Sequence, residues 1–482
     1  MSAMTECAGY LPGLDPDAVQ WSPQSYGPAD APLSVLLPVL EDTQITDVAR
    51  HVRYNSQTHL KALPVGQIVD AIDRAVARLL DCEDPYRRRM DALLPVITGY
   101  DREMVRLGLT GYLKTFRKPQ LQRFLAEDFA NPAVLDDFQP LTKGGFGQAF
   151  GPDVLAHIWA GNVPGLPLWS LVAGLLVKAG NVGKIPSAEP LFAGWFAQVL
   201  AEVEPALAEC LAIVWWRGGD IAPETALLQQ ADLILGYGNN TSLSAIQSRV
   251  PGTKRFLSYG HKVSFGMISA GALDASKAAA TARLAAYDIV RYDQQGCYSP
   301  HMLFVEHGGS VTPERFAHYI AHELAALEKK FPRRALSMAE AGGIATWRNA
   351  EEMMQGGQVF GEAAGAWSVS YQSNNTAFIP SGLNRTIRVV SIDALADVPA
   401  IVAPYKALLQ TVGIAAAPKD LFRLAAALGA VGVTRICAVG DMTSPEAGWH
   451  HDGRFNLLDL IAITEIDGRA ESAADRLASY VV

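Results

Sequence analysis

The fold is decided between Val154 and Ile185, where the chain reads VLAHIWAGNVPGLPLWSLVAGLLVKAGNVGKI. In this stretch Val154–Trp159 predicts a buried strand, Leu168–Lys178 a helix and Asn181–Ile185 a second strand. The alternation continues with a helix over Glu189–Glu202, a strand over Leu211–Trp216, a helix over Glu224–Gln230 and a strand over Leu233–Tyr237. Alternation of strands and helices is typical of parallel sheets covered by helices on both faces, so the sequence predicts an α/β fold.

The ends of these strands are where a ligand is expected. Open parallel sheets bind ligands in the crevice at the carboxyl ends of their strands. Here those ends carry Ala160–Asn162, Lys184–Ser187 and Gly236–Asn240. Small and polar residues gather in all three segments, which favours a cofactor or substrate site along this edge.

The rest of the chain divides into regions of different pattern. Residues 1–60 are rich in Pro, Gly and polar residues and predict an irregular arm, whereas Val65–Phe129 has the spacing of helices. A helix is expected over Ala275–Val290, and a second α/β region from Met302 to Val439. Its expected strands are Leu303–Val305, Ile387–Ser391 and Arg435–Val439. The apolar tail Leu457–Ile466 either closes a sheet edge or pairs with another subunit.

These regions predict four parts of the chain. They are an N-terminal arm and helical region over residues 1–150, a cofactor-binding α/β domain over 151–262, a catalytic α/β domain over 263–455, and a C-terminal tail over 456–482 that supplies an oligomerisation strand.

Composition excludes several classes of protein. Of 482 residues, 49% are hydrophobic and 18% charged, which indicates a packed globular chain. The net charge of −9 argues against a broad nucleic-acid-binding face. The cysteines are Cys7, Cys82, Cys210, Cys297 and Cys437. Their wide spacing and odd number argue against a disulfide framework or a thiolate zinc site, and favour the reducing cytoplasm.

Neither a secretory signal nor a transmembrane segment is expected. The N-terminus, Met1–Gly13, is acidic and interrupted by Pro and Gly. Val154–Val177 has no Asp, Glu or Arg and no Lys, and it is long enough to cross a bilayer. Its prolines and glycines would break a single helix, however, and leave backbone groups unpaired in lipid. A buried strand, a loop and a buried helix account for it better.

Cys297 is the strongest candidate for a reactive group. It follows Gly296 on a predicted turn, just ahead of the apolar run Met302–Val305. A thiolate attacks carbonyl and thioester carbons well and is also a good leaving group. A lone cysteine is more often a small buried hydrophobe, so this residue needs support from other segments.

Four segments in order carry a resemblance to a known family. They are Gly161–Pro164 with Ala179–Ser187, then Ile234–Asn240, then Asp293–Pro300, and finally Leu409–Ile414 with Gly432–Ile436 and His450–Gly453. Together they resemble the bacterial acyl-CoA reductases of the type that makes long-chain aldehyde for bioluminescence. That family is similar to the aldehyde dehydrogenases. The resemblance, over residues 80–466, implies an aldehyde dehydrogenase-like fold with a Rossmann-like cofactor domain and an α/β catalytic domain.

The resemblance also assigns roles to single residues. Cys297 would be the nucleophile, and the amide of Asn162 would stabilise the developing oxyanion beside the Cys297 backbone N–H. Lys184 and Ser187 would meet the adenosine ribose of the cofactor. Gly238 and Asn239 would meet its pyrophosphate, although they do not form a complete GxGxxG motif. The implied cofactor is NADPH, with no metal.

One departure from aldehyde dehydrogenases is informative. The position of their water-activating Glu corresponds to Ser258 in Ser258–Lys262. Without that base, hydrolysis of a thioester intermediate should be slow, while exchange with a CoA thiol remains available. His261 and His451 are expected at the mouth of the site. The pair His450 and His451 lacks the spacing of a metal site.

The leading interpretation is an oxidoreductase that uses NADPH to reduce a medium- or long-chain fatty acyl-CoA to the aldehyde through an acyl-Cys297 intermediate. The substrate would be an acyl-CoA or an acyl-carrier thioester, delivered by an acyltransferase or synthetase partner to a homo-oligomer. Three alternatives remain open: an aldehyde dehydrogenase working in the oxidative direction, a cysteine acyltransferase or thioesterase without a redox step, and a scaffold with a degenerate site.

Overall fold

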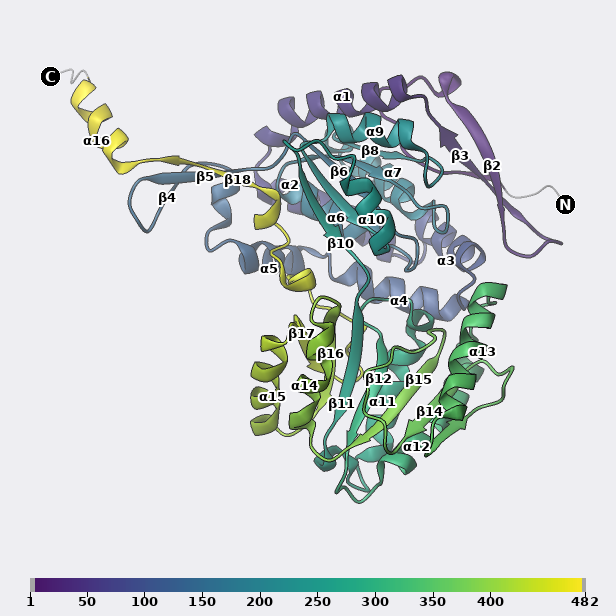
Figure 1. Cartoon of the computed structure of the whole chain (residues 1–482). Helices are drawn as coiled ribbons and strands as arrows, with labels where there is room; N and C mark the ends of the chain where they lie inside the picture. Colours follow the sequence, from purple (N-terminus) through teal and green to yellow (C-terminus); the bar gives the residue numbers. More distant parts are fainter. Residues whose placement is uncertain (1–4, 479–482) are drawn as a thin grey trace.

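The structure is a computed structural model that describes residues 5–478. Figure 1 shows two α/β bodies, one above the other. The upper sheet has the order β10-β9-β6-β7-β8, all parallel, with β6 Val154–Ile158, β7 Gly180–Lys184, β8 Leu211–Val214, β9 Leu233–Tyr237 and β10 Arg255–Tyr259. The lower sheet has the order β13-β14-β15-β12-β11-β16-β17, with β11 Val263–Ile268, β12 Pro300–Glu306, β13 Gly357–Phe360, β14 Ser368–Gln372, β15 Thr386–Ile392, β16 Leu409–Ala415 and β17 Arg435–Ala438. Only β13 in this sheet is antiparallel to its neighbour.

Helices cover both faces of each sheet, as the strand–helix alternation predicts. In the upper body, Leu155 packs with α6 and α7, whereas Val154 and Ala156 pack with α1 and α9, because side chains alternate along a strand. The helices of this body are α1 Asp42–Thr58, α2 Val65–Leu80, α3 Pro85–Thr98, α4 Arg102–Lys114, α5 Lys118–Asp128, α6 Pro167–Leu176, α7 Phe192–Val203, α8 Pro205–Ala208, α9 Ile221–Gln230 and α10 Asn240–Gln247. The predicted α/β class is confirmed, and so is the helical character of Val65–Phe129.

The lower body follows the same rule on a wider sheet. Its helices are α11 Ala278–Val290, α12 Pro313–Lys330, α13 Met338–Met353, α14 Val398–Val402 and α15 Pro418–Ala430. Leu303 of β12 packs on the side of α11 and α12, and Phe304 packs on the side of α15. The expected strands at β12, β15 and β17 are confirmed. The strands β11, β13, β14 and β16 also belong to this sheet and were not expected.

The expectation of an irregular arm over residues 1–60 is wrong. This region forms a three-stranded sheet in the order β1-β3-β2, followed by α1, with β1 Thr5–Cys7, β2 Gln20–Tyr26 and β3 Leu33–Val39. Pro23 does not break β2, because β2 is an edge strand and an edge proline removes no interior ladder bond. Leu33, Val35 and Leu37 alternate inward on β3, a period that the prolines obscure in the sequence.

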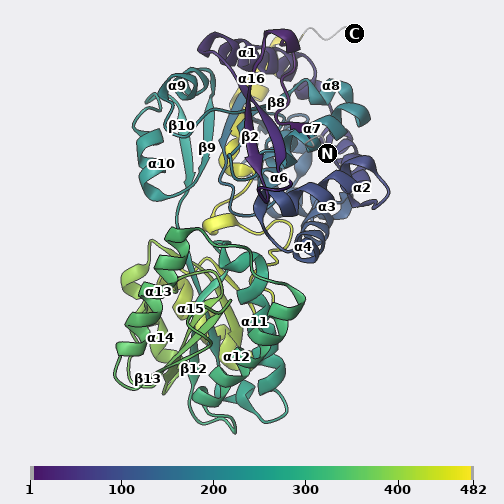
Figure 2. The same cartoon turned by 90° about the vertical axis from the view of Figure 1, so that its right-hand side faces the viewer.

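The tail pairs within its own chain. β18 Ala462–Ile466 is antiparallel to β5 Phe146–Phe150, which also pairs with β4 Gln139–Pro140. Figures 1 and 2 show this small sheet and α16 Gly468–Leu477 lying away from the lower body. β18 is an edge strand of this sheet.

The two large sheets face each other end to end. β10 ends at Tyr259 and β11 begins at Val263, so the chain leaves the carboxyl edge of the upper sheet and enters the amino edge of the lower one (Figure 1). Cys297 precedes β12 at that amino edge. The strand ends expected to bind a ligand therefore lie on the side of the upper sheet that faces the turn of Cys297.

Two left-handed segments hold this turn in place. Tyr292, Asp293 and Gln294 have positive φ of 47°, 50° and 62°, and the same is true of Leu383–Arg385. Such a conformation costs roughly 1–2 kcal/mol for each non-glycine residue. Both segments persist because they are bonded to each other. The backbone N–H of Asn384 donates to the Asp293 carbonyl at 3.0 Å.

A buried ion pair completes this clamp. Arg385 Nε donates to Asp293 Oδ1 at 2.7 Å, and both side chains are at most 2% exposed. Arg385 Nη1 donates to Glu328 Oε2 at 2.6 Å and to the Phe331 carbonyl at 2.7 Å. Gln294 Nε2 donates to the carbonyls of Pro300 and Thr386. The turn before Cys297 is thus tied to β12 and β15 of the lower sheet.

Replacing Asp293 by Asn should destabilise the chain strongly. Removing one member of a buried ion pair leaves the other charge uncompensated and typically costs about 3–5 kcal/mol. Asp47→Asn is the matched control, since Asp47 meets Arg50 at 3.6 Å on an exposed helix face and such pairs contribute about 1 kcal/mol or less. Urea unfolding of both variants measures the difference. Equal unfolding midpoints for the two variants would contradict the clamp.

Candidate active site

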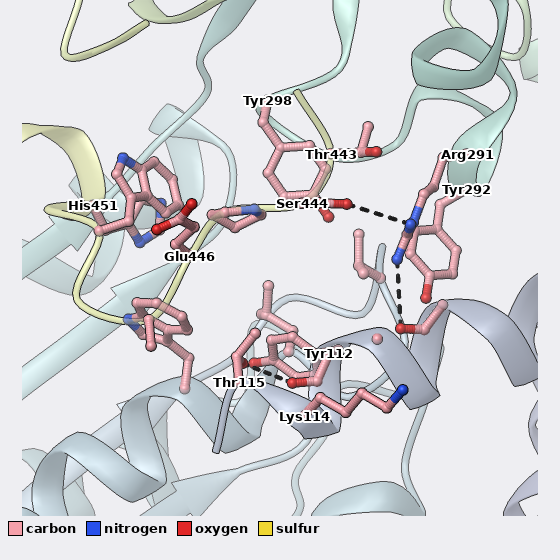
Figure 3. Close-up of a pocket in the computed structure, with 18 of the residues that line it drawn as sticks. Tyr112, Lys114, Thr115, Arg291, Tyr292, Tyr298, Thr443, Ser444, Glu446 and His451 are labelled. Carbon is pink, nitrogen blue, oxygen red and sulfur yellow. Dashed lines mark hydrogen bonds between the residues drawn. The ribbon is translucent and has the colours of Figure 1, made fainter. Parts of the chain in front are cut away.

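Cys297 lines a cavity of about 520 Å³ at the junction of the two bodies. Its walls come from α4, the segment Val163–Trp169, the turn Arg291–Tyr298 and the loop Thr443–His451, and Figure 3 shows these side chains converging on a common space. Tyr and Trp side chains supply much of the lining, as expected of a site for an organic substrate. The partial exposure of Cys297 is exposure to this cavity.

Hydrogen bonds hold the backbone of Cys297, and an amide lies near its thiol. Ser264 Oγ donates to the Cys297 carbonyl at 2.7 Å and accepts from Thr411 N at 3.1 Å, so β11 and β16 both hold the backbone. The side chain of Gln410 lies near the thiol and lowers its pKa. Gln410 Nε2 also donates to Asp452 Oδ1 at 2.6 Å, which orients the amide. An N–H of Gln410 therefore stabilises the thiolate form.

The thiol is protonated near neutral pH. Burial raises the pKa of Cys297 to about 11, and the negative charge of Asp452 acts in the same direction. Gln410 opposes the shift without overcoming it. Reaction of Cys297 at neutral pH thus needs a group that takes its proton when substrate binds.

His451 is the cavity residue best suited to accept that proton. Burial lowers its pKa, so the ring is neutral near pH 7 and has a free nitrogen lone pair. The ring stacks on Tyr259 at 4.5 Å between centroids, and Tyr259 stacks on Tyr237 at 4.8 Å. Asp452 acts on the pKa of the thiol and accepts from Gln410, and its Oδ1 lies 3.9 Å from His451 Nε2, so His451 and the thiol share the same end of the cavity.

Asn162 lies beside the cysteine turn but outside the cavity of Cys297. Its Nδ2 donates to the Gln295 carbonyl at 2.6 Å, and its own carbonyl accepts from Tyr100 Oη at 2.9 Å. Asn162 lines a second cavity of about 400 Å³, together with Ser187 and Gln295. Its second amide hydrogen has no bond within the structure, so the role of oxyanion donor stays a prediction.

The residues expected at the cofactor ribose face different surroundings. Lys184 is half-buried, and burial lowers its pKa while Glu224 opposes that shift. Ser187 Oγ accepts from Trp215 Nε1 at 3.1 Å. Glu189 is buried and turned inward, where Oε1 accepts from Leu191 N and Phe192 N at 2.9 Å each. No carboxylate on this short segment therefore points at the ribose position.

The residues expected at the pyrophosphate leave room for it. A Cβ added to Gly238 would meet no atom within 4 Å. Asn239 caps α10, with its side chain accepting from Ser242 N at 2.8 Å. Backbone N–H groups at such a helix start favour a phosphate. His261 is exposed, does not line the cavity, and donates its backbone N–H to Asn240 Oδ1.

Gln410 and Asp452 are site residues that motif spacing did not reveal as such. Both occur in segments that carry the resemblance, and a polar Gln410 inside the apolar strand β16 is the signal that could have found it. Between Thr5 and Ala478 no group of three or more His, Cys, Asp or Glu side chains is placed to hold a metal ion. In the same range no helix is long and apolar enough to cross a membrane.

The sequence of the chain is similar to those of several known proteins. The family model described as acyl-CoA reductase (LuxC) matches residues 60–463. A long-chain acyl-protein thioester reductase of Photorhabdus laumondii is 24% identical over 439 residues, covering 89% of this chain and 86% of that protein. Another from Photorhabdus luminescens is 26% identical over 300 residues, covering 61% and 58%. A third from Aliivibrio fischeri is 25% identical and covers 83% and 81%.

Structural comparison gives the same fold. Aldehyde dehydrogenase 21 from Physcomitrella patens superposes with a TM-score of 0.72 at 15% identity, covering 96% of this chain and 98% of that chain. Glyceraldehyde-3-phosphate dehydrogenase GapN from Methanocaldococcus jannaschii, complexed with NADP, has a TM-score of 0.71 at 12% identity, covering 93% and 99%. The predicted aldehyde dehydrogenase-like fold is confirmed.

Alkylation of Cys297 in the protein without ligands should accelerate steadily with pH. Only the thiolate reacts, and below a pKa of about 11 its fraction rises about ten-fold for each pH unit. Mass spectrometry of the Cys297 peptide after iodoacetamide treatment, from about pH 7 to about pH 10, measures the rate. Gln410→Leu should react more slowly at every pH because it loses a donor to the thiolate. A rate that reaches a plateau near neutrality would contradict this protonation state.

Proposed function

Because the chain belongs to the acyl-CoA reductase (LuxC) family, we propose that it reduces an acyl thioester to the aldehyde through an acyl-Cys297 intermediate. The observation that carries the proposal is the Cys297 thiol, which lies near Gln410 and opens on a cavity lined by aromatic residues. The names of the relatives, long-chain acyl-protein thioester reductases, support a long-chain acyl group on a protein, and the description of the family model supports an acyl-CoA. We keep a medium-chain fatty acyl group within the proposal.

The thiol attacks the thioester carbonyl once its proton has left. His451 accepts this proton, and the N–H of Gln410 holds the thiolate until the C–S bond forms. The CoA or carrier thiolate departs with a proton and leaves the acyl group on Cys297. NADPH, when bound, supplies the hydride that reduces this acyl thioester. Collapse of the resulting thiohemiacetal then releases the aldehyde and restores the thiol of Cys297.

The oxyanion formed in these steps needs donors. The Cys297 backbone N–H is one, and the side chain of Asn162 is the second, through its unbonded amide hydrogen. One such donor typically contributes about 3 kcal/mol to the transition state. The 2.6 Å bond from Asn162 to the Gln295 carbonyl supports the role, because it holds the amide beside the turn that carries the thiol.

The residues at the upper sheet edge fit NADPH. Gly238 leaves open space and Asn239 begins α10, where the pyrophosphate would lie. Lys184 would hold the ribose with its 2′-phosphate, beside Ser187. The inward-turned Glu189 supports the phosphorylated cofactor, because it does not oppose a 2′-phosphate with its charge.

Reduction is favoured over hydrolysis and over oxidation of an aldehyde to an acid. In aldehyde dehydrogenases both of the disfavoured reactions use a Glu carboxylate that activates water. Among the described residues that line the cavity, Glu446 has the only carboxylate, and it pairs with Arg123 at 2.7 Å. Ser258, at the position of the missing Glu, cannot act as that base. A cytoplasmic homo-oligomer remains part of the proposal, with the edge strand β18 available to a second copy.

Cys297→Ser should abolish aldehyde formation without unfolding the chain, because a hydroxyl is a far weaker nucleophile at neutral pH. Incubation with an acyl-CoA and no cofactor should add the acyl mass to the wild type, and peptide mapping should locate it on Cys297. Cys82→Ser is the control, since Cys82 is exposed and lies outside the cavity. Acylation at Cys82 or Cys437 instead would sink the assignment.

Lys184→Ala should weaken NADPH binding by roughly ten-fold or more and NADH binding less, because one charge-assisted contact typically contributes about 1.5–3 kcal/mol. Fluorescence titration of both cofactors measures the two changes. Lys419→Ala, which removes an exposed lysine of α15, should change neither. An equal loss for both cofactors would make Lys184 a ribose ligand that does not discriminate between them, and no loss would place it outside the site.

A further inference from the structure

The cavity of Cys297 contains a guanidinium that no carboxylate neutralises. Arg291 lines this cavity six residues before Cys297. Its nitrogens meet the Gly108 carbonyl and Ser444 Oγ, both at 3.5 Å, and Nε is buried without a hydrogen-bond partner. The hydroxyls of Tyr287 and Tyr292 also interact with Arg291, and its guanidinium carbon lies 5.6 Å from the centre of the Tyr292 ring. Among residues 5–478 no carboxylate oxygen lies within 4.0 Å of it.

Two fully buried arginines of the chain, unlike Arg291, have a carboxylate beside them. Arg385 and Arg388 each lie against a carboxylate, at 2.7 Å from Asp293 and 3.5 Å from Glu351. Placing a cation out of water is costly unless it is paired, which explains that pattern. Arg291 meets only neutral groups, namely a carbonyl, hydroxyls and the Tyr292 ring, so an anion supplied from outside the chain would gain a strong interaction there.

The surroundings of Arg291 also favour an anion. Thr443 lines the cavity, is 3% exposed, and its Oγ1 has no partner. Lys114 lies at the cavity with its side chain exposed and in no ion pair of the described chain. Glu446, whose carboxylate pairs with Arg123, lies at the opposite side of the cavity (Figure 3). The end of the cavity at Arg291 is therefore cationic, and the Thr443 hydroxyl there has no hydrogen-bond partner.

The cationic end and the thiol end are separate. Figure 3 shows Arg291 with Thr443 and Ser444 at one side of the cavity, His451 with Glu446 at the other, and Tyr298 and Tyr112 between them. The thiol lies near His451, through the Gln410 and Asp452 contacts. An acyl group bound to Cys297 would extend past Tyr298 and Tyr112 towards Arg291.

We propose that the acyl group selected by this cavity carries a carboxylate at the end remote from the thioester. The substrate class would be the monothioesters of dicarboxylic acids. A guanidinium presents paired donors that match both oxygens of a carboxylate, and Thr443 Oγ1 can donate a further bond. The inference rests on the proposed reduction of an acyl thioester and narrows its substrate. The aromatic wall between the two ends would pack on the methylene chain.

The test compares matched acyl groups with and without the terminal carboxylate. The kcat/KM of wild type is measured for adipoyl-CoA against hexanoyl-CoA and suberoyl-CoA against octanoyl-CoA. We expect the carboxylated member to be preferred in at least one pair. Arg291→Met should lower its kcat/KM about ten- to one-hundred-fold and leave the alkyl substrate within a few-fold. Arg291→Lys should keep part of the preference. Arg315→Met, an exposed arginine of α12 outside the cavity, should change neither.

Binding is measured separately from reduction. Free adipate should slow alkylation of Cys297 by iodoacetamide in wild type and not in Arg291→Met, whereas hexanamide should protect both proteins alike. If neither CoA ester is reduced but adipate protects, the proposed reduction fails and the carboxylate site stands. Equal loss for both members of a pair in Arg291→Met, a wild-type preference for the alkyl substrates, or no protection by adipate would overturn the carboxylate site.

Discussion

The ion pair between Asp293 and Arg385 is the constraint on which the rest of the site depends. It joins two segments of left-handed backbone that would each be unfavourable alone. One segment leads into Cys297, and the other leads into β15 in the middle of the lower sheet. Cys297 leads into β12, and β12 pairs with β15. The turn before Cys297 is therefore held at two neighbouring strands of the lower sheet. The position of the thiol is thus fixed by contacts between Asp293 and Arg385, which lie about ninety positions apart in the sequence. The turn of Cys297 need not be rigid by itself.

This rigidity comes with a chemical consequence. A thiol held inside the protein loses hydration, so its pKa rises to about 11 and the reactive thiolate becomes scarce. Gln410 lies near the sulfur and lowers the pKa of the thiol, which favours the thiolate. Asp452 orients Gln410 through a hydrogen bond. His451 is neutral because burial lowers its pKa, so its ring can accept a proton, which a permanently charged side chain could not do. In the proposed reaction it takes the thiol proton as the sulfur bonds to the acyl carbon.

The sequence predicted the parts of this arrangement that are local. Apolar runs alternating with helices between Val154 and Tyr237 were enough to place four strands of the upper sheet, but not the edge strand β10. The turn of Cys297 was recognised from its Gly and the strand after it. The sheet over residues 20–39 was missed, because its prolines lie on an edge strand and at a strand end, where their cost is small. Arg385, Gln410 and Arg291 could not be recognised as parts of one site. Their roles depend on which side chains lie beside them in the folded chain, and the sequence does not show those neighbours.

The junction of the two bodies explains how one site could serve both a cofactor and an acyl group. Tyr237 and Tyr259 end neighbouring strands of the upper sheet, and their rings stack with His451, which comes from the C-terminal part of the chain. Tyr237 and His451 of this stack line the cavity that contains Cys297. Stacked rings bury a large apolar area and leave little room for water, which would otherwise compete for an acyl thioester. The same rings that join the bodies therefore protect the intermediate that the proposed reaction requires.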